Sequence, residues 1–159
     1  MEKKAVENLV AYCGLYCGEC FARKGMIADL ARDLRKELRR TRFDILAEAM
    51  SEVSYFKVFK DYQPAYEVLG AMVKFRCKRG CRENGGNPGC KIRTCCRKKA
   101  LTGCWECAEY FDCPKLDTLN ATHGDAHRKN LNILKRKGVP GFLSGKKHWY
   151  IKPKNKSKN

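Results

Sequence analysis

The sequence lacks the long apolar runs that place many proteins at a membrane. No stretch approaches the ~18 consecutive apolar residues that span a bilayer, so no transmembrane helix is predicted. The opening MEKKAVENLVAY has no apolar run of the kind found in a signal peptide. From these absences we expect a cytoplasmic protein with no membrane partner.

The chain also has few of the groups that carry catalysis. It contains 3 histidines and no glycine-rich phosphate loop, nucleophile elbow or paired-carboxylate motif. We therefore nominate no catalytic residue and lean against an enzyme. His123 and His127 are four apart and would share one face of a helix, which makes them a candidate metal clip. Solvent-facing positions on a helix are the commoner outcome for such a pair.

Cysteine, by contrast, is abundant, and the 11 cysteines fall into two clusters. The first cluster is Cys13-x3-Cys17-x2-Cys20, and the second runs from Cys77 to Cys113. Pairs spaced C-x2-C or C-x3-C supply two metal ligands from one tight turn. The candidate metal ligands are Cys13, Cys17, Cys20, Cys77, Cys81, Cys90, Cys95, Cys104, Cys107 and Cys113.

Metal ligation explains these cysteines better than disulfides do. Disulfides are rare in a reducing cytosol, and an odd cysteine count fits a pure disulfide framework poorly. At 43% hydrophobic residues, the chain can bury a core without disulfides. We therefore expect one or two zinc ions that staple the cysteine-rich loops in an interaction or adaptor module. A non-radical iron–sulfur or redox site stays open, because thiolates bind iron as well as zinc.

The first cluster also matches the iron–sulfur signature of radical S-adenosylmethionine enzymes. Those enzymes place an aromatic residue before the last cysteine, where this chain has Glu19. They also need a partial β/α barrel, whereas this chain is short and its pattern is helical. Both points argue against that class.

The spacing suggests which cysteines share an ion. Because 22 residues separate Cys81 from Cys104, two paired-cysteine knuckles would fit one four-thiolate site made of Cys77, Cys81, Cys104 and Cys107. Neighbouring side chains on a helix diverge by about 100°, so adjacent Cys95 and Cys96 are not expected to hold the same ion. We set Cys96 aside as a non-ligand.

Positive charge is concentrated in the C-terminal half. The formal net charge is +17, and residues 76–159 carry 21 Lys and Arg against 6 Asp and Glu. Such a surface attracts polyanions, so the alternative function is binding of nucleic acid or another acidic partner. No recognition helix or RNA-binding motif accompanies the charge.

Periodicity predicts a mainly α fold with few or no strands. Apolar residues recur at helical spacing from Ile27 to Leu38 and from Phe43 to Val53, the latter with Thr41 as the expected N-cap. Pro64 fits the first turn of a third helix, residues 91–100 a short one, and residues 119–137 a last long one. We expect one domain over residues 1–145 and a basic, disordered tail over 146–159.

The motifs together resemble a known family. Ala11-Tyr12-Cys13-Gly14-Leu15-Tyr16-Cys17-Gly18-Glu19-Cys20 is similar to the opening of the prokaryotic family called domain of unknown function 3795. The later motifs Gly85-Gly86-Asn87-Pro88-Gly89-Cys90, Gly103-Cys104-Trp105-Glu106-Cys107 and Cys113-Pro114 follow the same pattern, and the resemblance covers about residues 8–143. It implies a zinc-binding protein of unknown activity. This chain departs from many relatives in the wider Cys77-x3-Cys81 spacing and in having Cys96 where they have alanine.

Overall fold

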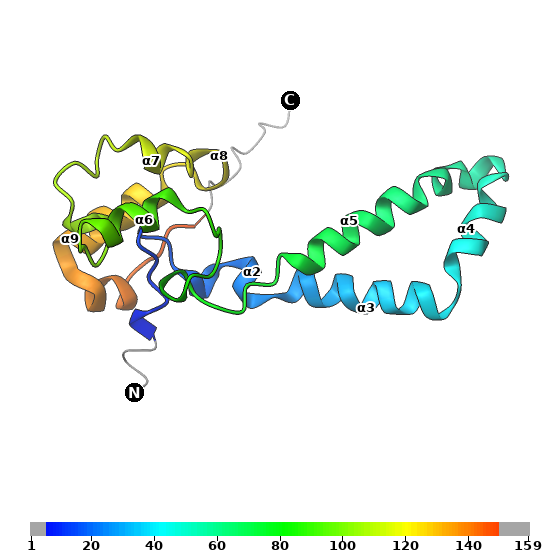
Figure 1. Ribbon diagram of the computed structural model, residues 1–159, viewed down its shortest axis with the longest axis horizontal. Helices are drawn as coiled ribbons and strands as arrows, with labels where there is room; N and C mark the ends of the chain where they lie inside the picture. Colours follow the sequence, from blue (N-terminus) through cyan, green and yellow to red (C-terminus); the bar gives the residue numbers. More distant parts are fainter. Residues whose placement is uncertain (1–5, 150–159) are drawn as a thin grey trace, which may run out of the picture. The chain divides into compact units, whose positions relative to one another are not determined.

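A computed structural model describes residues 6–149. It divides the chain into two compact units, one made of Met1–Cys20 with Arg79–Asn159 and the other of Phe21–Lys78. We call the first the cysteine unit and the second the hairpin unit. Helices dominate both units, and an isolated antiparallel bridge joins Val10 and Tyr16 (Figure 1). The predicted mainly α fold is confirmed for the described residues.

The hairpin unit is built on two long antiparallel helices. Its elements are α2 (Phe21–Lys24), α3 (Met26–Arg40), α4 (Phe43–Ser51), the 3-10 helix η2 (Ser54–Asp61) and α5 (Tyr62–Lys74). Helices α3 and α5 run side by side (Figure 1). A guanidinium nitrogen of Arg35 donates to the carbonyl of Tyr66 at 2.8 Å, and Arg76 pairs with Asp29. These contacts fix the register of the pair.

The hairpin unit buries small residues and exposes large ones. Its buried side chains are Ala28, Ala31, Ala47 and Ser51, so α3 and α5 approach closely without a large apolar core. Six large apolar side chains at helical spacing stay exposed, and we call them the apolar stripe: Ile27, Leu30 and Leu34 on α3, and Val68, Met72 and Phe75 on or just after α5.

The stripe lies on one face of the hairpin. Each stripe residue of α3 comes one position before a residue that is buried or bonded to α5: Ala28 and Ala31 are buried, and Arg35 donates to the carbonyl of Tyr66. Each stripe residue of the α5 segment likewise comes one position before Leu69, Val73 or Arg76. In an antiparallel pair, equal offsets in the same sense place residues on the same face.

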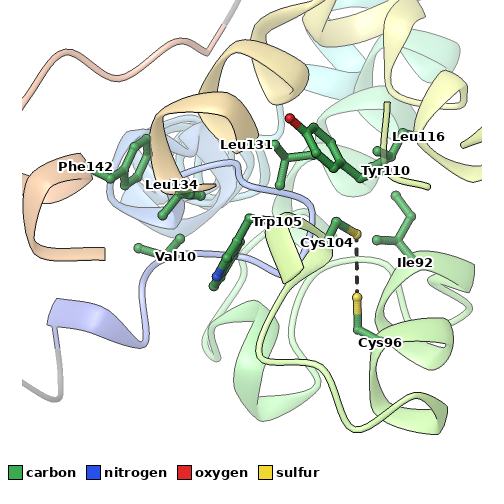
Figure 2. Packing of buried hydrophobic residues seen from close by; sticks show 10 residues of the cluster. All are labelled: Val10, Ile92, Cys96, Cys104, Trp105, Tyr110, Leu116, Leu131, Leu134 and Phe142. Atoms are coloured by element: carbon green, nitrogen blue, oxygen red, sulfur yellow. Dashed lines mark hydrogen bonds between the residues drawn. The ribbon is translucent and has the colours of Figure 1, made fainter. Parts of the chain in front are cut away.

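The cysteine unit contains short helices and one long one. Its elements are η1 (Cys17–Glu19), η3 (Cys81–Glu83), α6 (Lys91–Lys98), η4 (Cys104–Glu106), α7 (Pro114–Asp117), α8 (Asn120–His123) and α9 (Ala126–Ser144). Its core, shown in Figure 2, consists of Val10, Ile92, Cys96, Cys104, Trp105, Tyr110, Leu116, Leu131, Leu134 and Phe142. The core therefore joins the N-terminal segment to α6, η4, α7 and α9.

The N-terminal segment is held in place by backbone and arginine contacts. The N–H of Cys104 donates to the carbonyl of Tyr12 at 2.8 Å. The side chain of Arg82 donates to the carbonyls of Val10 and Thr102 and lies over the Tyr12 ring. At Gly14 the backbone has φ 83°, and a Cβ there would lie 3.0 Å from the Leu131 side chain, so both strain and space favour glycine.

Two predicted helix boundaries differ in the structure. Thr41 is not the N-cap of α4, because its hydroxyl donates back to the carbonyl of Glu37 at 3.0 Å and closes α3 instead. Arg42, with φ 52°, is the N-cap residue. The last long helix begins at Ala126 rather than near residue 119, and its regular part ends at Gly138, whose φ of 64° breaks the helix as predicted.

The start of the predicted tail is bonded to α9. The side-chain amide of Asn130 donates to the carbonyl of His148 at 2.8 Å and accepts from its N–H at 2.9 Å. The lysine tail that we predict to be disordered falls mainly on residues 150–159, which lie outside the described residues. The single-domain prediction over residues 1–145 likewise stays a prediction. Within residues 6–149, no helix is long and apolar enough to cross a membrane.

Candidate metal centre

Two C-x2-C turns of the cysteine unit share one backbone conformation. In η1 the N–H of Cys20 donates to the carbonyl of Cys17 at 3.1 Å, and in η4 the N–H of Cys107 donates to that of Cys104 at 3.0 Å. The second cysteine of each turn is extended, with φ −69° and ψ 122° at Cys20 and φ −77° and ψ 131° at Cys107. The two turns therefore carry their cysteines at equivalent backbone positions, in keeping with their shared C-x2-C spacing.

Cys13 lies within electrostatic reach of cysteines from other parts of the sequence. Burial raises the pKa of its thiol to about 12, although a backbone hydrogen bond at Leu15 opposes the shift. The negative charges of Cys81, Cys90 and Cys17 contribute to this rise of the Cys13 pKa. We call these four cysteines the Cys13 group. Cys90 is also the N-cap of α6, where its sulfur accepts the N–H of Arg93 at 3.5 Å.

A second set of cysteines surrounds a small cavity behind α6, which we call the Cys104 cavity. Its volume is about 20 Å³, and its lining includes Cys95, Cys96, Cys104, Cys107 and Cys113 together with the apolar side chains of Ile92, Leu101, Tyr110 and Leu116. The contact with Cys96 is the largest cause that raises the pKa of the Cys104 thiol, followed by burial and by the charges of Cys96, Cys13 and Cys113.

These sets differ from a closed metal site. Among residues 6–149, no three or more Cys, His, Asp or Glu side chains are gathered closely enough to hold an ion. The structure associates Cys81 with Cys13 and Cys107 with the Cys104 cavity, while Cys77 lies in the hairpin unit with its N–H bonded to the carbonyl of Ala22. The four-thiolate site of Cys77, Cys81, Cys104 and Cys107 stays a prediction.

Sequence reasoning missed the position of Cys96. Cys95 and Cys96 are adjacent on α6, yet both border the Cys104 cavity. Cys96 is 2% exposed and belongs to the core cluster. Its spacing of eight residues from Cys104 was the available signal, but that signal does not reveal that the chain turns back between them.

The two histidines do not share one helix face, so the candidate metal clip on a single helix is not formed. α8 ends at His123 and α9 begins at Ala126, with Gly124 at φ 53° between them. Nδ1 of His123 lies 2.7 Å from the carbonyl oxygen of Trp149. His127 is fully buried, and neither ring nitrogen has a hydrogen-bond partner among the described residues.

The basic side chains of the cysteine unit fall into two groups. Several arginines donate to backbone carbonyls within the unit, among them Arg82, Arg93, Arg97 and Arg128. Lysines instead line an open groove of about 430 Å³ beside α6, which we call the lysine groove: Gly89, Lys91, Thr94, Cys95, Lys98, Lys99 and Lys115. Its lining includes no carboxylate.

Comparison with known proteins places the chain in one family. The model of the family described as "Protein of unknown function (DUF3795)" matches residues 9–118, more than half of the chain. The chain belongs to this family. The match confirms the resemblance seen in the cysteine motifs and covers both the Cys13 group and the Cys104 cavity. No curated protein matches the chain, and no solved structure does.

Proposed function

We propose that the cysteine unit binds zinc through thiolates and that the metal staples its loops in an interaction module. The observation that carries the proposal is the Cys13 group, in which the charges of Cys81 and Cys90, from a distant part of the chain, and of Cys17 raise the pKa of Cys13. Four thiolates are the donor set of a structural zinc site, and a metal would neutralise charges that otherwise repel one another.

The Cys104 cavity would supply a second set of donors. Cys104 and Cys107 come from a turn with the same conformation as that of Cys17 and Cys20, and Cys95 and Cys113 border the same cavity. These eight candidate ligands therefore divide into two sets that fit the one or two ions expected. Zinc would supply structural cross-links there, because thiolates close its coordination.

The interaction part of the proposal is supported by the apolar stripe. Contiguous exposed apolar side chains mark surfaces that bind other molecules. The stripe spans two helices at spacings of three and four residues, which suits the apolar face of a partner's amphipathic helix. On α3 next to the stripe lie Asp33 and Glu37, each in an ion pair with an arginine of the same helix, Arg32 and Arg40 respectively.

Elemental analysis of protein purified without oxygen tests the metal. We expect zinc in the intact chain and a loss of zinc in the double variant Cys13→Ser, Cys81→Ser. The variant Cys96→Ala is the matched control, because we do not assign Cys96 as a ligand, and it should keep the metal. A brown sample that contains iron would favour the iron–sulfur alternative. A metal-free protein with unchanged circular dichroism and thermal midpoint would contradict the proposal.

A second candidate function is the binding of nucleic acid, and the lysine groove favours it. Four lysines line the groove, and although Lys99 lies 3.4 Å from the carboxylate of Glu109, together they form a positive surface that suits phosphates. Such contacts would be tolerant of sequence, since phosphates carry no base information. Binding to single- and double-stranded DNA and RNA oligonucleotides should therefore weaken steeply as salt rises.

Lysine substitutions test this candidate and locate the contact. We expect Lys91→Ala with Lys98→Ala to weaken binding and to reduce the slope of log affinity against log salt by about 1 for each phosphate that the protein no longer neutralises. Lys57→Ala with Lys60→Ala in the hairpin unit is the charge-matched control. Truncation after Trp149 measures how much of the affinity comes from the lysine tail. It keeps His148, whose carbonyl accepts a hydrogen bond from Asn130 of α9. If the two double variants bind nucleic acid with equal affinity, the lysine groove is not the contact surface.

A further inference from the structure

Two thiols of the cysteine unit are in direct contact. The sulfur atoms of Cys96, on α6, and Cys104, at the start of η4, lie 3.5 Å apart (Figure 2). Both are free thiols, and their residues are 2% and 8% exposed. They therefore meet inside the core, away from competing thiols of other molecules.

The backbone on both sides of this contact is fixed. The N–H of Leu101 donates to the carbonyl of Cys96 at 2.9 Å, which turns the chain back after α6. The N–H of Cys104 donates to the carbonyl of Tyr12 at 2.8 Å. Because neither sulfur must search for the other, reaction between them has the advantage of a held geometry.

We propose that Cys96 and Cys104 form a redox-active dithiol that hydrogen peroxide converts to a disulfide. One sulfur attacks the peroxide, so that an S–O bond forms, the O–O bond breaks and one water leaves. The second sulfur then displaces the hydroxyl of the sulfenic acid, which forms the S–S bond and releases a second water. Two thiols and one peroxide thus give one disulfide and two waters.

The surroundings select a small oxidant. The adjoining Cys104 cavity has a volume of about 20 Å³, and a cavity of roughly 10–15 Å³ already accommodates a water-sized molecule. Its lining is apolar apart from thiols, the Tyr110 hydroxyl and two lysines. Hydrogen peroxide is small and uncharged, whereas a bulky disulfide such as oxidised glutathione does not fit such a space.

Oxidation would also change the metal set. A disulfide takes the Cys104 sulfur away from the donors around the cavity, so zinc bound there and the disulfide exclude each other. This consequence rests on the proposed function, whereas disulfide formation itself does not. The pair would thus act as a peroxide-triggered release of one metal ligand.

Peptide mapping of the intact chain tests the disulfide. Reduced protein, prepared without oxygen, is treated with one equivalent of hydrogen peroxide and digested with trypsin. We expect the peptide of residues 94–97, which contains Cys95 and Cys96, to be joined to the peptide of residues 100–115, which contains Cys104. An equal concentration of oxidised glutathione should yield at least tenfold less of this product.

Alanine variants identify the sulfurs. Cys96→Ala should abolish the cross-linked peptide, whereas Cys95→Ala, Cys107→Ala and Cys113→Ala should retain it. If the product persists in Cys96→Ala, or if wild-type protein gives sulfinic acids without a disulfide, the inference is wrong. The wild-type result does not depend on whether any variant folds.

Metal content measured on the same samples separates the two proposals. Cross-linking accompanied by zinc release supports both of them. Cross-linking in a protein that never contained zinc supports the dithiol and contradicts the proposed function. Zinc-loaded protein with no cross-link, both before and after removal of the metal by a chelator, overturns the dithiol alone.

Discussion

One buried arginine, Arg93, holds the loop of residues 85–88 in the cysteine unit. Arg93 is 5% exposed, and its guanidinium donates to the carbonyls of Gly85, Asn87 and Pro88 at 2.8, 2.7 and 3.2 Å. The run of glycine, asparagine and proline predicted a loop there, but nothing in the spacing indicated that an arginine five to eight residues later holds it. A buried charge is stable only when such partners satisfy it.

Arg93→Met should therefore destabilise the cysteine unit. The variant keeps much of the apolar stem but leaves three carbonyls with one donor fewer, which costs about 3 kcal/mol on the scale of hydrogen bonds to charged groups. Urea denaturation monitored by the fluorescence of Trp105 measures the change. Lys91→Met, at an exposed position on the same helix, is the control and should change the free energy of unfolding by less than about 0.5 kcal/mol.

His127 should make the fold sensitive to mild acid. Burial lowers the pKa of its imidazole below the ordinary value of 6.5; Arg128 and His123 lower it further, while Asp117 and Asp125 oppose the shift. As pH falls below 6.5, the unfolded chain binds a proton that the folded chain resists. The free energy of unfolding should then decrease, by at most about 1.4 kcal/mol per pH unit for one proton.

Denaturation at a series of pH values from 7.5 to 5 checks this prediction. The variant His127→Leu should flatten the pH dependence. His148→Gln is the control for the loss of a histidine. Burial also lowers the pKa of His148, but this residue is only half-buried and lies near the end of the described chain. Equal slopes for the wild type and His127→Leu would show that another group causes the acid sensitivity.

At the scale of elements, the sequence predicted where the helices lie better than it predicted which segments pack together. The 3.6-residue period identified α3, α4 and α5 because amphipathic spacing is local information. Helix caps were harder, since Thr41 bonds backward to Glu37 instead of forward into α4. The paired-cysteine turns were predicted from C-x2-C spacing, but the grouping of Cys81 with Cys13 was not, because it depends on how distant segments pack.

The apolar stripe leads to a prediction for the hairpin. Leu34→Lys with Met72→Lys should leave the free energy of unfolding within about 1 kcal/mol of the wild type, because exposed positions tolerate substitution. The same change should reduce the binding of a dye that reports exposed apolar surface, such as anilinonaphthalene sulfonate. Lys36→Gln with Lys74→Gln, away from the stripe, is the control. If the stripe variant binds as much dye as the wild type, the apolar surface that binds the dye lies elsewhere.

At the scale of the whole molecule, the hairpin unit begins and ends at one place. The N–H of Cys77 donates to the carbonyl of Ala22 at 2.9 Å, and Arg23 donates to the carbonyl of Lys78 at 2.8 Å. Domain insertion is tolerated where the inserted segment begins and ends at adjacent positions. A short glycine–serine linker in place of residues 24–75 should therefore leave the cysteine unit folded.

Two measurements check the shortened chain. Circular dichroism and urea denaturation should show a cooperative transition, and peroxide should still join the peptides that contain Cys96 and Cys104. A shortened chain without a cooperative transition would mean that the cysteine unit requires the hairpin. The full-length chain under the same conditions is the reference.

The division of the cysteine unit into residues 1–20 and 79–159 sets an order of events during synthesis. When residues 6–20 leave the ribosome, the α6 and η4 segments that pack against them do not yet exist. The hairpin, whose contacts join nearer parts of the sequence, is complete earlier and can fold first. Until translation passes α9, the cysteines of the first cluster are therefore exposed to the redox state and the metal supply of the cell.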